Sequence, residues 1–178
     1  MKRKLRIDLS DLQMVFEDNF HEHHYYLDVE TGEVVLVSDE IRSALERIYE
    51  DNTAEEGHQE RSFAEAVAES GLSDWMKDMV LDADRVEEGF GARFIEIAKV
   101  QSSEDYRAME DFTESVEDQR LQERLWMVLN GRRPFRHFKD VLMDYPEEEK
   151  QWFKFLDARH RSQLLEWLEE EEIDPIID

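Results

Sequence analysis

The sequence predicts a predominantly helical α+β fold in which a small antiparallel sheet, made of an N-terminal hairpin and one further strand, packs with a C-terminal helical bundle. Three observations lead to this prediction. Apolar residues recur at the spacing of an amphipathic helix through most of the chain. Residues 25–37 contain two stretches with the residue pattern of β-strands, separated by a turn sequence, as in a hairpin. Residues 92–100 form a further, shorter stretch in which apolar and polar residues alternate.

The first fifty residues predict a helix, a hairpin and a second helix. Residues 9–20 carry apolar side chains at helical spacing, and Asp8 or Ser10 is placed to accept the free backbone N–H groups at the helix start. In the hairpin, Gly32 supplies the positive φ that a tight turn needs. Ser38 is placed to cap the next helix. Four apolar residues form the inward stripe of that helix: Ile41, Ala44, Leu45 and Ile48.

The middle of the chain loses and then regains the helical pattern. Residues 51–62, with the sequence DNTAEEGHQERS, lack the regular spacing of apolar residues that a helix would show. We expect them to form a mobile acidic loop. Helical spacing then resumes and continues, with an interruption at Gly71, as far as Gly89, and Trp75 is expected in the buried stripe. Residues 92–100 are expected to add a third strand to the hairpin.

The C-terminal half predicts four successive helices. Ser102, Asp118 and Pro134 mark the starts of the first three, because these residue types suit a helix N-terminus. Tyr145-Pro146 separates the third from the fourth. Large apolar residues are expected to face the core of this bundle: Phe112, Leu125, Phe135, Phe138, Leu142, Trp152, Leu164 and Trp167.

The composition is that of a folded chain. With 178 residues, of which 40% are hydrophobic and 11% aromatic, the chain has enough apolar material for one core. We therefore expect residues 1–178 to form a single domain.

The formal net charge of -24 is the most unusual feature of the composition. It repels nucleic-acid backbones and anionic lipid surfaces at long range, and it also keeps a protein soluble in a crowded cell. The absence of cysteine suits a reducing compartment. No signal-peptide core is present near the N-terminus, and no run of about 18 apolar residues could span a bilayer. We expect a cytoplasmic protein that does not bind membranes.

Three stretches together resemble a bacterial family described as uncharacterised protein family 0158. They are YYLDVETGEVVLV at residues 25–37, FIEI followed by DYRAMEDF within residues 94–112, and GRRPFRHFKDVL at residues 131–142. Ala98 stands where members of this family usually have a proline after FIEI. The resemblance implies a bacterial domain of unknown activity, and it supplies no catalytic residues.

A local reversal of charge provides the candidate site. Between residues 120 and 139 there are six basic residues and one acidic residue, Glu123. We call the six basic residues the basic island: Arg120, Arg124, Arg132, Arg133, Arg136 and Lys139. Arginine matches phosphate and carboxylate groups geometrically, and the expected helix start at Pro134 adds free N–H groups. Alternatively, these cations pair internally with acids such as those at residues 147–149.

Catalytic and metal-binding patterns are absent from the sequence. The P-loop, the dinucleotide-binding glycine pattern, the G-x-S-x-G motif and the EF-hand pattern do not occur. His21, His23 and His24 lie close together, but no further ligands accompany them at a diagnostic spacing. We interpret them as residues leading into the hairpin, and His137 and His160 as residues of helix surfaces. We expect no metal ion and no cofactor, and enzymatic activity is not favoured.

These observations favour a cytoplasmic, non-enzymatic interaction or regulatory domain that binds an acidic protein partner or an anion through Arg132, Arg133, Arg136 and Lys139. Two alternatives stay open. In the first, the chain is associated with nucleic acid, either through the basic island or as an acidic mimic of nucleic acid, although the net charge opposes direct binding. In the second, it is an enzyme of unfamiliar class, which a deep pocket with perturbed titratable groups would indicate.

Overall fold

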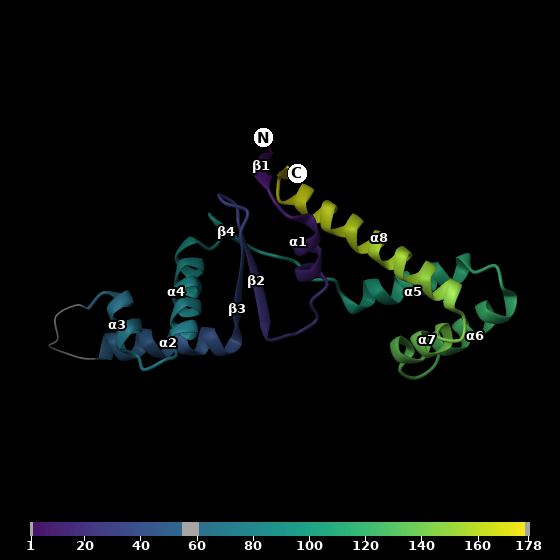
Figure 1. Ribbon diagram of the computed structural model, residues 1–178, viewed down its shortest axis with the longest axis horizontal. Helices are drawn as coiled ribbons and strands as arrows, with labels where there is room; N and C mark the ends of the chain where they lie inside the picture. Colours follow the sequence, from purple (N-terminus) through teal and green to yellow (C-terminus); the bar gives the residue numbers. More distant parts are fainter. Residues whose placement is uncertain (1, 55–60, 177–178) are drawn as a thin grey trace. The chain divides into compact units, whose positions relative to one another are not determined.

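The computed structural model describes residues 2–54 and 61–176. Contacts between residues divide the chain into two compact units, the first formed by residues 1–98 with 172–178 and the second by residues 99–171 (Figure 1). The described residues form eight helices and five short strands. The predominantly helical α+β class is therefore confirmed, whereas the single domain stays a prediction.

The first unit contains all five strands that the described residues form. Its elements are β1 (Arg3–Arg6), α1 (Leu9–Phe16), β2 (His23–Asp28), β3 (Val34–Ser38), α2 (Asp39–Ala54), α3 (Phe63–Glu69), α4 (Asp74–Gly89), β4 (Phe94–Glu96) and β5 (Ile173–Ile176). The second unit is helical. It consists of α5 (Ser102–Ser115), α6 (Gln119–Leu129), α7 (Pro134–Leu142) and α8 (Pro146–Glu170).

The predicted hairpin and its third strand form an antiparallel sheet in the order β3-β2-β4. Gly32 has a φ of +84° in the connection between β2 and β3, as predicted. A Cβ atom at Gly32 would also lie 2.2 Å from the carbonyl oxygen of Arg6, so the close approach of another backbone requires glycine here as well. The third strand is shorter than the predicted residues 92–100, because only Phe94–Glu96 pair with β2.

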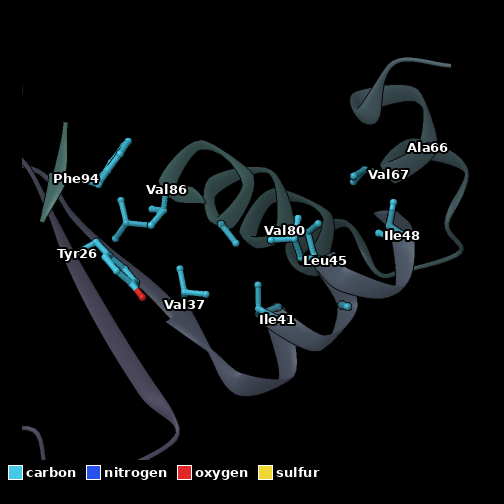
Figure 2. Packing of buried hydrophobic residues seen from close by; sticks show 13 residues of the cluster. Tyr26, Val37, Ile41, Leu45, Ile48, Ala66, Val67, Val80, Val86 and Phe94 are labelled. Atoms are coloured by element: carbon cyan, nitrogen blue, oxygen red, sulfur yellow. The ribbon is translucent and has the colours of Figure 1, made fainter. Parts of the chain in front are cut away.

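The core of the first unit lies between this sheet and two helices (Figure 2). Both α2 and α4 pack against the strand β3 and against each other. Apolar side chains from the three strands and the two helices interlock there: Tyr26, Val37, Ile41, Leu45, Val80, Val86 and Phe94. The predicted inward stripe of α2 is confirmed by its burial in this cluster.

A second, two-stranded sheet was not predicted. Strand β1 pairs in parallel with β5, with Arg3 opposite Ile173 and Arg6 opposite Ile176, so the two ends of the described chain lie side by side (Figure 1). Each strand has only four residues. A period of two cannot be recognised over so short a stretch, and parallel pairing between distant segments leaves no local turn signal.

The segment predicted as a mobile loop at residues 51–62 is partly helical. The helix α2 continues to Ala54, and the hydroxyl of Thr53 donates a hydrogen bond to the carbonyl oxygen of Tyr49, one helical turn earlier. Residues 55–60 lie outside the described residues, so the predicted mobility stays a prediction. Ser62 caps α3 in a reciprocal arrangement with Glu65. The loop prediction is therefore wrong for residues 51–54.

The second unit has an aromatic core formed by α5, α6, α7 and α8. Phe138 is fully buried. The centroid of its ring lies 5.0 Å from the ring centroid of Trp152 and 6.4 Å from that of Phe112. The predicted burial of Phe138, Leu142, Trp152, Leu164 and Trp167 is confirmed. None of the described helices combines the length and the apolarity that crossing a membrane would require.

Two aromatic residues that were predicted to be buried are exposed. Trp75 has 58% of its surface exposed, because it is turned by about 100° around α4 from the inward position of Met76. Phe135 has 40% exposed. It lies in the first turn of α7, where side chains tilt toward the helix N-terminus, and its ring lies edge-on to Tyr106, which is itself only partly buried at the border of the cluster.

Candidate functional site

The helix α6 presents the first two cations of the basic island. Asp118 accepts a hydrogen bond from the backbone N–H of Leu121 at 3.0 Å and so caps the helix, as predicted. One face of α6 is buried through Leu121, Leu125 and Leu129. The opposite face exposes Arg120, Arg124 and Met127, which lie at i, i+4 and i+7.

The connection between α6 and α7 carries the next two cations. Arg132 and Arg133 are exposed, and Arg133 takes the left-handed conformation with φ 52° and ψ 54°. A proline follows Arg133, and the residue before a proline is disfavoured in the right-handed helical region. The left-handed conformation costs a non-glycine residue about 1 kcal/mol. The buried residues Phe138 and Leu142 hold α7 in place and so maintain this turn.

The helix α7 begins at Pro134 without a side-chain cap and without an acidic residue in its first turn. The positive end of the helix dipole therefore adds to the charge of Arg136 in the first turn, whereas Lys139 lies in the last turn; both side chains are exposed. Packing of α7 against α6 in the second unit places the whole basic island on two neighbouring helices and their connection (Figure 1).

Few acids neutralise the island. Within the described part of the chain, Arg120, Arg132, Arg133 and Lys139 form no ion pair of 4.0 Å or less, and all four are exposed. Arg136 comes only within 4.0 Å of Asp140, with both side chains largely exposed. The acids at residues 147–149 were the alternative internal partners. Glu147 pairs with Lys150 at 3.3 Å, and no described ion pair joins these acids to the island.

Arg124 is the island residue with the most contacts. Its guanidinium lies 3.5 Å from Asp144, donates a hydrogen bond of 3.5 Å to the hydroxyl of Tyr145, and lies over the Tyr145 ring. The hydrogen bond to Tyr145 is the main cause that raises the pKa of Arg124 above its ordinary value, and the hydrogen bond to Asp144 contributes less. Exposed contacts of this kind contribute little stability. They do fix the position of one cation next to the C-terminal end of α7.

Exposed apolar side chains accompany the cations, a feature that the helical pattern did not reveal. Met127 on α6 has 74% of its surface exposed, and Met143, which directly follows α7, has 67% exposed. Phe135, at 40%, adds an aromatic ring beside Arg136. Side chains of this kind contribute contact area to a partner at little cost to the free protein. The surface therefore combines positive charge with apolar area.

His23 and His24 lie on opposite sides of β2 and do not converge, and His21 is exposed before the strand begins. The Nδ1 atom of His23 lies 2.9 Å from Asp18, whereas His24 contacts Asp39 at 3.1 Å and Glu96 at 3.4 Å. Across the residues that the structure describes, no group of three or more His, Cys, Asp or Glu side chains is arranged to hold a metal ion. Burial, and then the hydrogen bond that it donates to Asp18, raise the pKa of Tyr25 to about 12. Tyr25 therefore stays protonated and acts as a donor.

The prediction that His160 lies on a helix surface is wrong. Only 7% of its surface is exposed, and its Nε2 atom lies 2.7 Å from a carboxylate oxygen of Asp105. The two residues are 55 positions apart, so sequence spacing gave no signal of this contact. It joins α8 to α5 within the second unit.

The regions of the chain that match known proteins include the candidate site. The model of a family described as uncharacterised protein family (UPF0158) matches residues 72–178, which include the whole basic island. A UPF0158 protein of Pseudomonas aeruginosa is 28% identical over 173 residues, which are 97% of this chain and 88% of that protein. No solved structure matches the chain.

Proposed function

Since the chain belongs to the uncharacterised protein family UPF0158, a description that assigns no reaction, we propose a function from its surface: an interaction or regulatory domain that binds an acidic protein partner through the basic island. One observation carries this proposal. Arg132, Arg133 and Lys139 are exposed and have no ion-pair partner among the described residues, in a chain of net charge -24.

Cations without ion pairs are unexpected in a chain that has such an excess of acidic residues. With 46 acidic residues in the chain, an arrangement that neutralised the island internally was readily available, yet among the described residues only Arg124 and Arg136 of the island have acidic partners, Asp144 and Asp140, and Glu147 pairs with Lys150. Cations that are left exposed together raise the local positive potential, and this potential attracts carboxylates from another molecule. Arginine can also hold a carboxylate through two parallel hydrogen bonds, which orients the partner.

A protein partner is favoured over nucleic acid because the electrostatic repulsion from the whole chain acts over a longer distance than the attraction from the island. The net charge of -24 repels a phosphate backbone along its whole length, whereas a short acidic segment meets mainly the local field of the island. The cysteine-free composition suits a reducing compartment, and we place this interaction in the cytoplasm.

A direct binding measurement tests the proposal. A fluorescein-labelled oligoglutamate peptide is titrated with the purified protein at low ionic strength, and its anisotropy is recorded. We expect Arg133→Glu/Arg136→Glu to weaken binding by at least about tenfold, equivalent to about 1.4 kcal/mol. Glutamate at the start of α7 is compatible with the helix, because acidic side chains suit its positive end. The affinity of the unmodified protein should also fall as salt is added.

The matched control reverses two cations that already have acidic partners. Arg107 and Lys150 lie in the same unit, are 67% and 70% exposed, and pair with acids three residues away. Arg107→Glu/Lys150→Glu changes the net charge by the same amount and should leave most of the binding intact. Equal losses in the two double variants would show that only the total charge matters, and would contradict a site at the island.

A further inference from the structure

We infer that the partner of the basic island is an amphipathic acidic segment, carrying apolar side chains as well as carboxylates, and that Met127 and Met143 bind its apolar side. This inference rests on the proposed function and specifies the chemistry of the partner. It is carried by the position of the two exposed methionines relative to the cations.

Each methionine continues a row of cations along an exposed helix face. On α6, Met127 follows Arg124 by three residues and Arg120 by seven, and all three side chains are exposed. On α7 and the residue after it, Met143 follows Arg136 by seven residues and Lys139 by four, again on the exposed side. Both rows therefore place charge and apolar area on the same face.

The two rows lie close together. Arg124, in the middle of the α6 row, lies 3.5 Å from Asp144, the residue that follows Met143. Its guanidinium also lies over the ring of Tyr145, at 5.8 Å from the ring centroid. These contacts fix the α6 row beside the end of the α7 row, and α6 and α7 pack against each other along their buried faces. A partner that binds along the α6 row at Arg124 thus lies beside the end of the α7 row.

The methionines are not needed for the core of the second unit. That core is filled by the rings of Phe112, Phe138 and Trp152, while Met127 and Met143 keep 74% and 67% of their surface in contact with solvent. A methionine side chain is flexible and polarisable, and surfaces that receive apolar helix faces use it for this reason. Its exposure in rows with exposed cations, of which Arg120 and Lys139 have no ion pair among the described residues, therefore points to a partner with both kinds of group.

The combination of positive charge and apolar area distinguishes between the possible partners of this surface. The unpaired arginines require negative charge, and the methionines require apolar contact, which an inorganic anion does not offer. A nucleic-acid backbone would satisfy the arginines but is repelled by the net charge of -24. A helix or strand with carboxylates on one side and leucine or phenylalanine on the other satisfies both requirements.

Three labelled probes test this inference. The first is an acidic peptide with leucine at positions i, i+3, i+4 and i+7 and glutamate elsewhere; the second is oligoglutamate with the same number of glutamates; the third is a short DNA duplex. We expect the amphipathic peptide to bind at least about tenfold more tightly than oligoglutamate. Met127→Gln/Met143→Gln should remove this difference and leave the affinity for oligoglutamate within about twofold. Both substitutions lie at exposed positions, where folding is little affected.

Met14→Gln is the matched control, because Met14 is 68% exposed but lies on α1 of the first unit. It should leave all three affinities unchanged. If the unmodified protein binds the amphipathic peptide and oligoglutamate equally, the inference is overturned while the proposed function stands. If neither acidic peptide binds, both are overturned. If DNA binds more tightly than either peptide, the partner is a nucleic acid and the inference is also wrong.

Discussion

Replacing Arg93 by methionine is expected to lower the free energy of unfolding by about 3 kcal/mol. Arg93 holds the carboxylate of Asp28, which has no exposed surface, through hydrogen bonds of 2.7 Å from Nη2 and 3.0 Å from Nε. Without the guanidinium, this buried charge keeps mainly the backbone N–H of Glu30, at 2.9 Å. We expect no more than the lower end of the usual range for a broken buried pair, because that donor remains and because Arg93 itself is 40% exposed. Urea unfolding followed by circular dichroism measures the loss.

The effect of Arg93→Met should also depend on pH. Burial alone would raise the pKa of Asp28, but the hydrogen bond from Arg93, followed by the backbone donors, lowers it below its ordinary value. A carboxyl group whose pKa is lowered by folding contributes stability above its unfolded pKa and loses that contribution as the pH falls through the folded pKa. The difference between the unmodified protein and the variant should therefore be largest near neutral pH and shrink in acid.

Arg85 provides the control for this experiment. Its guanidinium also lies over the Phe94 ring, at 5.8 Å compared with 5.4 Å for Arg93, but its acidic partner Asp82 is 46% exposed. Arg85→Met should cost less than about 1 kcal/mol, because an exposed pair contributes little. Equal losses for the two variants would mean that stacking on Phe94, and not the buried carboxylate, makes Arg93 important.

Replacing Phe138 by alanine is expected to cost about 4 kcal/mol in the second unit. Its ring is fully buried between Trp152 and Phe112, with centroid distances of 5.0 Å and 6.4 Å, so truncation leaves a cavity that the neighbouring rings cannot fill. Phe135→Ala, three residues earlier in α7, should cost about 1 kcal/mol or less because its ring is 40% exposed. Similar urea midpoints for both variants would contradict the packing described for α7.

The hairpin and most helix boundaries were predictable because their signals are local. Gly32 marks the turn by its conformational freedom, and Asp118 marks the start of α6 by accepting a backbone N–H three residues later. Ser38 likewise accepts from Ile41 at the start of α2. In each case the residue and the group that it serves are close in the sequence, so a pattern of a few residues is enough.

Features that depend on distant segments were not predictable. The strand β1 finds its partner β5 at the other end of the chain, and His160 finds Asp105 in another helix. Helical spacing indicates which residues share a face of a helix. It does not indicate which turns of that helix lie beyond the core that the face packs against. Trp75 and Phe135, which both lie in the first turn of a helix, were consequently assigned to the core but are exposed.

The candidate site could be predicted only in part for the same reason. The six cations of the basic island lie within twenty residues, so their excess over acids is visible in the sequence. Whether distant acids neutralise them depends on the fold, and the described contacts leave Arg132, Arg133 and Lys139 without ion pairs. The exposure of Met127 and Met143 depends in the same way on which helix faces the core uses. Sequence patterns thus locate such a site, and tertiary structure determines its chemistry.

Site-specific photo-crosslinking in cells that produce the protein tests the central proposal most directly. A photoreactive residue is placed at the position of His137, which is exposed between Arg136 and Lys139, or at the position of Glu87 on α4, as a control. We predict that position 137 crosslinks to an acidic segment of one specific protein, and that Arg133→Glu/Arg136→Glu abolishes this product. The same products from both positions, unaffected by the charge reversal, would contradict a binding site at the basic island.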